Sequence, residues 1–363
     1  MKYISTRTTK REYTFTEAFL ESFAEDGGLL CPKEIPRIST DTLEKWSHLN
    51  FFDLYLAILS IFIDESDISS DDLEVLLKSV FEKFHQRELV TIKQVGPISL
   101  AESFYGPTYH IKDFSMQFIG HFLKYLVKKD ETNDAVCLLH SFVLVPHLRR
   151  ASMLAGVGSV DYRVNGFCIY PRNKIDYIQE REMISNVSTN GYSLCMENSG
   201  ISEVLRITRD LVTNNVHRDR IHIISANSGH IVRVLCELPI LFYAYFHSVE
   251  YPHQAAFSSY IANLKSTYAL CLARDMGLPI DHVVLSCRPK STVLDFFNKG
   301  EYQASLRNDP CKEEFRFVHS NMERCVLQPC SSLASSSTRF AAMSRSTWRR
   351  SRRASASLYR WRR

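Results

Sequence analysis

One lysine stands among residue types that suit carbonyl chemistry. Lys112 follows the turn-forming segment Gly106-Pro107-Thr108 and directly precedes a strongly apolar segment that we expect to be helical. The N-terminus of a helix carries partial positive charge, which lowers the proton affinity of an ammonium group held there. A lysine with a lowered pKa keeps more free amine, the form that builds a Schiff base on a carbonyl cofactor. Lys112 is therefore a candidate for covalent catalysis, and an ordinary solvated lysine is the alternative.

The run from Glu102 to Phe114 resembles the lysine motif of threonine synthases, which use pyridoxal phosphate (PLP); that motif is usually written E-x-x-x-G-P-T-x-x-F-K-D. Other segments resemble landmarks of the same family in collinear order over about residues 1–328. These segments are Ser5-Thr6-Arg7, Asp26-Gly27-Gly28-Leu29, Tyr170-Pro171, Ile178-Gln179-Glu180, Ala226-Asn227-Ser228, Gly277-Leu278-Pro279-Ile280 and Asn321-Met322-Glu323-Arg324. The last one resembles the animal threonine-synthase-like branch, whose members are phospho-lyases.

The resemblance implies the fold-type II PLP architecture, as in the tryptophan synthase β subunit. It implies that Lys112 holds PLP as a Schiff base and then acts as the base at the substrate Cα. Asn227, Ser228 and Arg233 would bind the phosphate of a small phosphorylated amino acid of the O-phosphohomoserine type. The products would be 2-oxobutyrate, ammonia and phosphate in a phospho-lyase, and threonine in a true threonine synthase. No metal site is expected.

Two loops that position the reactants in that family differ in this chain. After the expected strand at Ala135–Leu139, bulky residues from Phe142 to Leu144 stand where the family has the small residues of a TSGDTG loop. The loop that binds the PLP phosphate aligns with residues 262–266, where both of the family's glycines are replaced. A β-carbon there would push the backbone away from a phosphate. Lys265 and Ser266 remain as candidates for that phosphate, and a catalytically inactive relative, with a binding role or from a defective gene model, is the alternative reading.

The apolar periodicity predicts an α/β fold with an open parallel sheet and a mainly helical N-terminal domain. We expect this N-terminal domain over residues 1–95, a PLP-binding α/β domain over 96–328, and a Ser/Arg-rich disordered tail over 329–363. The expected strands are Ala135–Leu139, Gly166–Tyr170, Arg220–Ser225 and His282–Cys287. The expected helices include Asp113–Lys129, Val232–Phe246 and Tyr268–Met276, the last ending at Gly277 as a C-cap.

Composition bounds the class of protein. Hydrophobic residues make up 45% and charged residues 23% of the 363 residues, which is ordinary for a globular protein. The sequence has no apolar run of about 18 residues and no signal-peptide pattern, and its ten cysteines show no CxxC pair. We therefore expect a cytoplasmic protein with free thiols and no membrane span.

The basic charge is confined to the end of the chain. Residues 331–363 contain nine arginines and no acidic residue, against a net charge of +4, so the other residues carry about −5. The globular part therefore gives no electrostatic reason to expect nucleic-acid binding.

Overall fold

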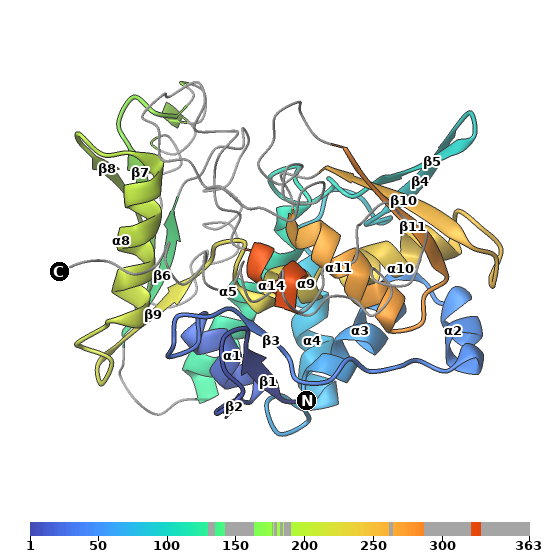
Figure 1. Ribbon diagram of the computed structural model, residues 1–363, viewed down its shortest axis with the longest axis horizontal. Coiled ribbons are helices and arrows are strands. Elements are labelled where there is room, and N and C mark those ends of the chain that lie inside the picture. The colour runs from blue at the N-terminus through green and yellow to red at the C-terminus, as the bar shows by residue number, and fades with distance from the viewer. Residues whose placement is uncertain are drawn as a thin grey trace, which may run out of the picture.

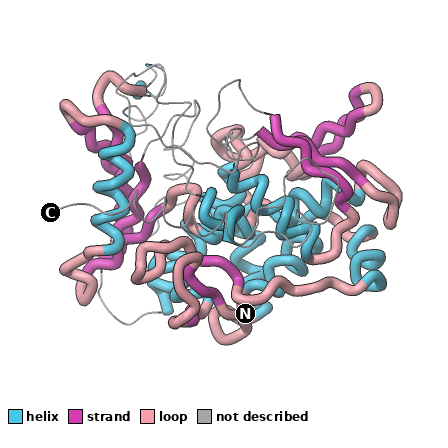
Figure 2. Tube along the Cα trace, viewed as in Figure 1, coloured by secondary structure: helices cyan, strands magenta, loops and turns pink. Residues whose placement is uncertain are grey.

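The computed structural model describes residues 1–129, 135–141, 163–175, 177, 180–181, 184, 190–260, 264–286 and 321–327. Its elements form an α/β fold with a helical centre, a parallel sheet on one side and a projecting hairpin on the other (Figure 1, Figure 2). The predicted tail at 329–363 and the segment from Phe142 to Leu144 lie outside the described residues.

The N-terminal part combines four helices with a small antiparallel sheet. All four helices follow a polar residue whose side chain accepts the N–H of the third helical residue, namely Thr14, Ser39, Asn50 and Ser69. The helices are α1 (Phe15–Glu21), α2 (Thr40–Ser47), α3 (Phe51–Phe62) and α4 (Ser70–Phe81). The sheet, which the sequence analysis missed, has the order β2 (Glu12–Tyr13), β1 (Tyr3–Ser5), β3 (Leu30–Pro32). Its strands have two or three residues, too few to show an alternating pattern.

Helix α5 (Lys112–Lys129) runs through the core and begins at the candidate lysine. Its residues Phe114, Phe118 and Phe122 are buried, as their spacing predicts, and they pack edge-on or stacked against aromatic rings of the N-terminal helices. One hydrophobic core joins this helix to α1, α3 and α4. The helix that carries Lys112 is therefore fixed by the N-terminal part of the chain.

The parallel sheet has four strands in the order β8-β7-β6-β9, which are β8 (Gly191–Met196), β7 (Val164–Pro171), β6 (Ala135–Ser141) and β9 (Ile221–Ser225). Helix α8 (Ile201–Thr213) packs against β6, β7 and β9 on one side of this sheet (Figure 1). The fourth predicted strand is β11 (Ile280–Ser286), and it pairs in parallel with β10 (Ala255–Tyr260) in a separate two-stranded sheet. The prediction of one sheet for all four strands was wrong on this point, and strands β8 and β10 were missed.

The predicted helix Val232–Phe246 is broken into α9 (Ile231–Leu235) and α10 (Leu238–Phe246). Pro239 lies in the first turn of α10, where its missing N–H and its restraint on the preceding residue favour a new helix start. Helix α11 (Leu264–Asp275) begins four residues before the predicted start at Tyr268, so Lys265 and Ser266 lie in its first turn. It ends at Gly277, whose φ of +114° and N–H bond to the Arg274 carbonyl are those of a C-cap glycine, as predicted.

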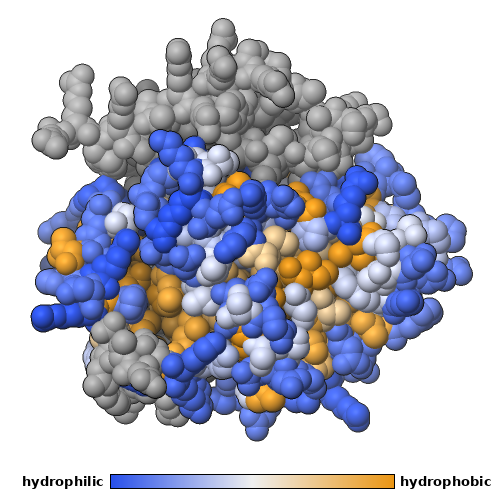
Figure 3. Space-filling view, turned by 90° about the horizontal axis from the view of Figure 1, so that it is seen from below, coloured by the Kyte–Doolittle hydropathy of each residue, from blue (hydrophilic) through white to orange (hydrophobic). Residues whose placement is uncertain are grey.

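An antiparallel hairpin, β4 (Thr91–Val95) and β5 (Ile98–Glu102), projects from the body next to β10 and β11 (Figure 1). Its turn contains Gly96, with a φ of +59° and open space around it. The face of the molecule in Figure 3 is mostly hydrophilic, with apolar residues exposed in separate areas. Within the described ranges, no helix has the length and apolar character to cross a bilayer.

Candidate active site

Lys112 is the first residue of α5 and is half-buried. The turn before it wraps around the carboxylate of Asp113, which accepts hydrogen bonds from Thr108 N at 2.8 Å, Thr108 Oγ1 at 2.7 Å and His110 N at 3.3 Å. The Lys112 N–H donates to His110 Nδ1 at 3.0 Å. Tyr109, within this turn, has a φ of +52°, a strained value for a residue other than glycine. Asp113 thus fixes the turn that places Lys112, which is a structural role.

A buried group of charged side chains lies where α9 and α11 pack together. Glu237 accepts a hydrogen bond from Ser266 Oγ and forms an ion pair with the Lys265 ammonium, and both charged side chains are buried. Burial lowers the pKa of Lys265, although the carboxylate of Glu237 acts in the opposite direction. An ammonium in the core needs such a partner.

Arg233 is 2% exposed and lies one helical turn before Glu237. Its Nη1 donates to the Ala226 carbonyl at 3.4 Å, and its Nε has no hydrogen-bond partner among the described residues. Burial lowers the pKa of Arg233 to about 10, against the opposing charges of Glu237 and Asp113. The guanidinium therefore stays charged at neutral pH while few acceptors satisfy it.

The loop between β9 and α9 carries the other two candidates. Asn227 is half-buried and Ser228 is exposed. The short helix α14 (Met322–Leu327) holds this loop, because Asn321 Nδ2 donates to the Ser228 carbonyl at 2.8 Å and Arg324 Nη2 donates to the Gly229 carbonyl at 2.8 Å. The predicted phosphate loop is thus fixed by residues almost a hundred positions later.

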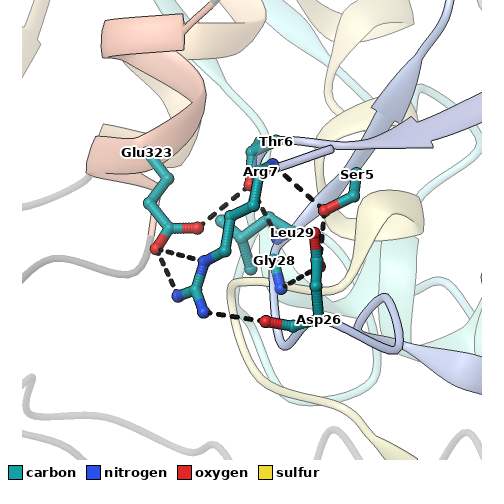
Figure 4. Close-up of polar contacts among 7 residues, drawn as sticks. All are labelled: Ser5, Thr6, Arg7, Asp26, Gly28, Leu29 and Glu323. Atoms are coloured by element: carbon teal, nitrogen blue, oxygen red, sulfur yellow. Dashed lines mark hydrogen bonds and ion pairs between the residues drawn. The ribbon is translucent and has the colours of Figure 1, made fainter. Parts of the chain in front are cut away.

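The same short helix is tied to the N-terminal sheet. The Arg324 guanidinium also donates to the Leu30 carbonyl at 2.6 and 3.0 Å, and its side chain is fully buried. Figure 4 shows Arg7 lying between Glu323 and Asp26, with its guanidinium 2.6 Å from the Glu323 carboxylate. Two motifs at opposite ends of the sequence therefore form one polar junction.

His230 ends this loop as the N-cap of α9, in full burial. Its Nδ1 accepts the Val232 N–H, so its Nε2 carries the proton donated to the Phe19 carbonyl at 2.9 Å. This arrangement uses the neutral ring, and burial lowers the pKa of His230 from 6.5 to about 4.

A pH dependence of stability follows from His230. Between pH 6.5 and 4 the unfolded chain binds a proton that the folded chain does not, so this contribution to stability is full above pH 6.5. It should fall by about 3 kcal/mol as the pH drops through that window. In urea titrations, His230→Asn should reduce the loss of unfolding free energy between pH 6.5 and 4. His247→Asn, at an exposed histidine, should leave that loss unchanged. An unaltered pH profile in the His230 variant would contradict the assignment.

The structure brings some predicted residues together and adds one. Arg233, Lys265 and Ser266 lie around Glu237, and Asp113 of the lysine turn is close enough to influence Arg233 electrostatically. Asn227 and Ser228 lie on the loop that leads into the same helix. Sequence reasoning missed Glu237, although a lone carboxylate in an otherwise apolar run was a usable signal, since a buried acid is nearly always paired. The described residues contain no group of His, Cys, Asp or Glu arranged to hold a metal ion.

Comparison with known proteins finds similarity to threonine synthases. The family model described as the threonine synthase N terminus matches residues 2–81. The threonine synthase of Eremothecium gossypii is 28% identical over 340 residues, which cover 89% of this chain. The chain is therefore similar in sequence to threonine synthases. Threonine synthase-like 2 of Xenopus laevis is also 28% identical, over 84% of this chain.

Solved threonine synthases share the fold. The yeast threonine synthase superimposes with a TM-score of 0.75 at 23% identity, covering 90% of this chain and 66% of the yeast chain. The PLP-bound threonine synthase of Brucella melitensis gives 0.78 at 19% identity, covering 97% and 76%. The predicted α/β architecture of fold-type II is therefore confirmed. The chain spans 65%, 60% and 61% of the length of three curated threonine synthases that it matches.

The candidate residues for PLP differ in whether their surroundings suit the cofactor. Lys112 is half-buried at the start of α5, behind the turn that Asp113 fixes, and this position is compatible with a lysine that carries the cofactor. Lys265 and Ser266 do not fit the phosphate in this arrangement, because the Glu237 carboxylate already takes both side chains. The aligned residues Ala262 and Asn263 lie outside the described residues.

Proposed function

We propose that this chain is a PLP-dependent enzyme of the threonine synthase type that eliminates phosphate from an O-phosphohomoserine-like substrate, with Lys112 as the cofactor lysine. The observation that carries the proposal is the position of Lys112 as the first residue of α5, behind the turn that Asp113 fixes. The chain is 28% identical to a threonine synthase and to a threonine synthase-like 2 protein, and this similarity supports the reaction class. The products would be 2-oxobutyrate, ammonia and phosphate in the phospho-lyase form, or threonine in the synthase form.

The chain's own residues would have separate tasks. PLP, when bound, supplies an electron sink for negative charge at the substrate Cα. Lys112 Nζ would remove the Cα proton, and the partial positive charge at the start of α5 favours the neutral amine that this task needs. Asn227 and Ser228, on the loop held by α14, would orient the substrate phosphate, which leaves from Cγ with the C–O electron pair as a proton is lost from Cβ and the Cβ=Cγ bond forms. Arg233 would neutralise that phosphate.

The test is an absorbance titration of the whole chain with PLP. We expect a band above about 400 nm that disappears in Lys112→Ala and remains in Lys128→Ala, which removes an exposed lysine at the far end of the same helix. Release of inorganic phosphate from O-phosphohomoserine should follow the band. Absence of the band at saturating PLP would reject the proposal.

The second candidate is a catalytically inactive relative with a binding role. This candidate is favoured because Lys265 and Ser266 both contact the Glu237 carboxylate. Neither side chain is then placed to donate to the PLP phosphate. In that case neither the wild-type chain nor Lys128→Ala would develop the band.

A further inference from the structure

The four charged groups around α9 balance one another. Lys265 forms an ion pair with Glu237, the carboxylates of Glu237 and Asp113 both influence Arg233 electrostatically, and all four side chains are buried. The carboxylate of Asp113 is held by the turn before α5, through three hydrogen bonds, so its place is fixed. Glu237 is therefore the anion that completes the balance for the two cations.

The two cations differ in their contacts with this carboxylate. Lys265 and Ser266 both contact Glu237, one at each carboxylate oxygen. Arg233 makes one long hydrogen bond, of 3.4 Å, to a backbone carbonyl, and its Nε has no partner among the described residues. Buried guanidinium groups normally use most of their donors, and planar oxyanions satisfy several at once. The Arg233 guanidinium can therefore donate to an anion that has more oxygen atoms than one carboxylate.

We propose that Arg233, Lys265 and Ser266 form a buried oxyanion site and that Glu237 occupies it as an internal stand-in for a bound phosphate group. While the Glu237 carboxylate is in place, an entering phosphate would add negative charge to a balanced cluster in a low-dielectric interior, which is unfavourable. Removal of that one negative charge leaves the site with a net positive charge and a free lysine. Glu237 is then an autoinhibitory contact rather than a ligand.

This inference rests on the proposed function and adds a condition to it: Arg233 can take the substrate phosphate only after the Glu237 carboxylate has moved away from Lys265 and Ser266. Its test does not depend on PLP or on turnover. The melting temperature of the full chain is measured in sodium phosphate and in sodium chloride of equal ionic strength. The isosteric variant Glu237→Gln should melt at a lower temperature than the wild type in chloride, because Lys265 loses its ion pair.

With phosphate at about a hundred times its dissociation constant, Glu237→Gln should gain on the order of 4 °C, whereas the wild type should gain less than about 1 °C. The double variant Glu237→Gln with Lys265→Met should lose this gain. The matched control is Glu203→Gln, the same charge change at an exposed residue of α8, and it should behave as the wild type. If Glu237→Gln does not stay folded in chloride, the readout becomes refolding yield with and without phosphate.

Three results would overturn the proposal. One is a Glu237→Gln variant that responds no more than the wild type; another is a wild type that already shows the full gain, since the site would then be open. The third is a gain that survives Lys265→Met or appears in Glu203→Gln, because phosphate would then act elsewhere. None of these results depends on the absorbance band of Lys112, so a failure of the proposed reaction and a failure of this inference remain distinguishable.

Discussion

Replacement of Arg324 by methionine is expected to lower the free energy of unfolding by about 3–4 kcal/mol. The fully buried guanidinium donates four hydrogen bonds, two of them to the Leu30 carbonyl, one to the Gly229 carbonyl and one to Asn321 Oδ1. Methionine keeps much of the side-chain volume but leaves these acceptors buried and unpaired, which is more costly than the loss of the bonds alone. Urea unfolding of both proteins gives the difference directly.

The matched control for this prediction is Arg206→Met on the surface of α8. Arg206 pairs with Asp210 at 2.9 Å, and both side chains are more than a third exposed, so its loss should cost less than about 1 kcal/mol. Equal effects of the two substitutions would show that the short helix α14 does not hold the N-terminal sheet and the loop before α9 together. A large effect of Arg324→Met alone would show that it does.

Gly106→Ala is expected to weaken PLP binding by about a hundredfold, because a misplacement of about an ångström at a reacting group has effects of that size. A β-carbon at this glycine would lie 2.3 Å from Asp113 Cβ and 2.5 Å from Asp113 Oδ2, closer than atoms can approach. Either the turn or the start of α5 must then move, and Lys112 moves with it. The measurement is the PLP titration used for Lys112, together with urea unfolding.

The control is Gly96→Ala, the same chemical change at the tip of the β4–β5 hairpin. Nothing lies within 4 Å of that position, and its φ of +59° makes alanine unfavourable by about 1 kcal/mol. Gly96→Ala should therefore lose a little stability and keep PLP binding. If Gly106→Ala binds PLP as well as Gly96→Ala does, the turn does not set the position of Lys112.

Much of the fold was predictable because its long elements carry strong periodic signals. The stripe of Phe114, Phe118 and Phe122 predicted α5. The breaks were harder to predict. Pro239 interrupts an apolar run that reads as one helix, and the pairing of β11 with β10 instead of β6 is a tertiary choice that no local pattern records.

The sequence could nominate candidate site residues, but it could not predict their contacts. Resemblance to a motif selected Lys112, Arg233 and Lys265, and they do lie on packed helices of one region. It did not reveal that Lys265 pairs with Glu237, because two residues 28 positions apart in sequence meet only through the packing of α9 on α11. Partners of buried charges depend on tertiary contacts, whereas helix starts depend on neighbours along the chain.

The junction at Arg324 has a consequence for the growing polypeptide. Leu30 and Arg324 are 294 residues apart, so at 5–20 residues per second the ribosome needs about 15–60 s to deliver the donor after the acceptor. During that interval the Leu30 carbonyl must bind water, or a chaperone, in place of the guanidinium, and the Gly229 carbonyl must do so for the last 95 residues of synthesis before Arg324. Nascent chains arrested before residue 324 should therefore be cleaved by protease at both segments, and chains extended past it should be protected.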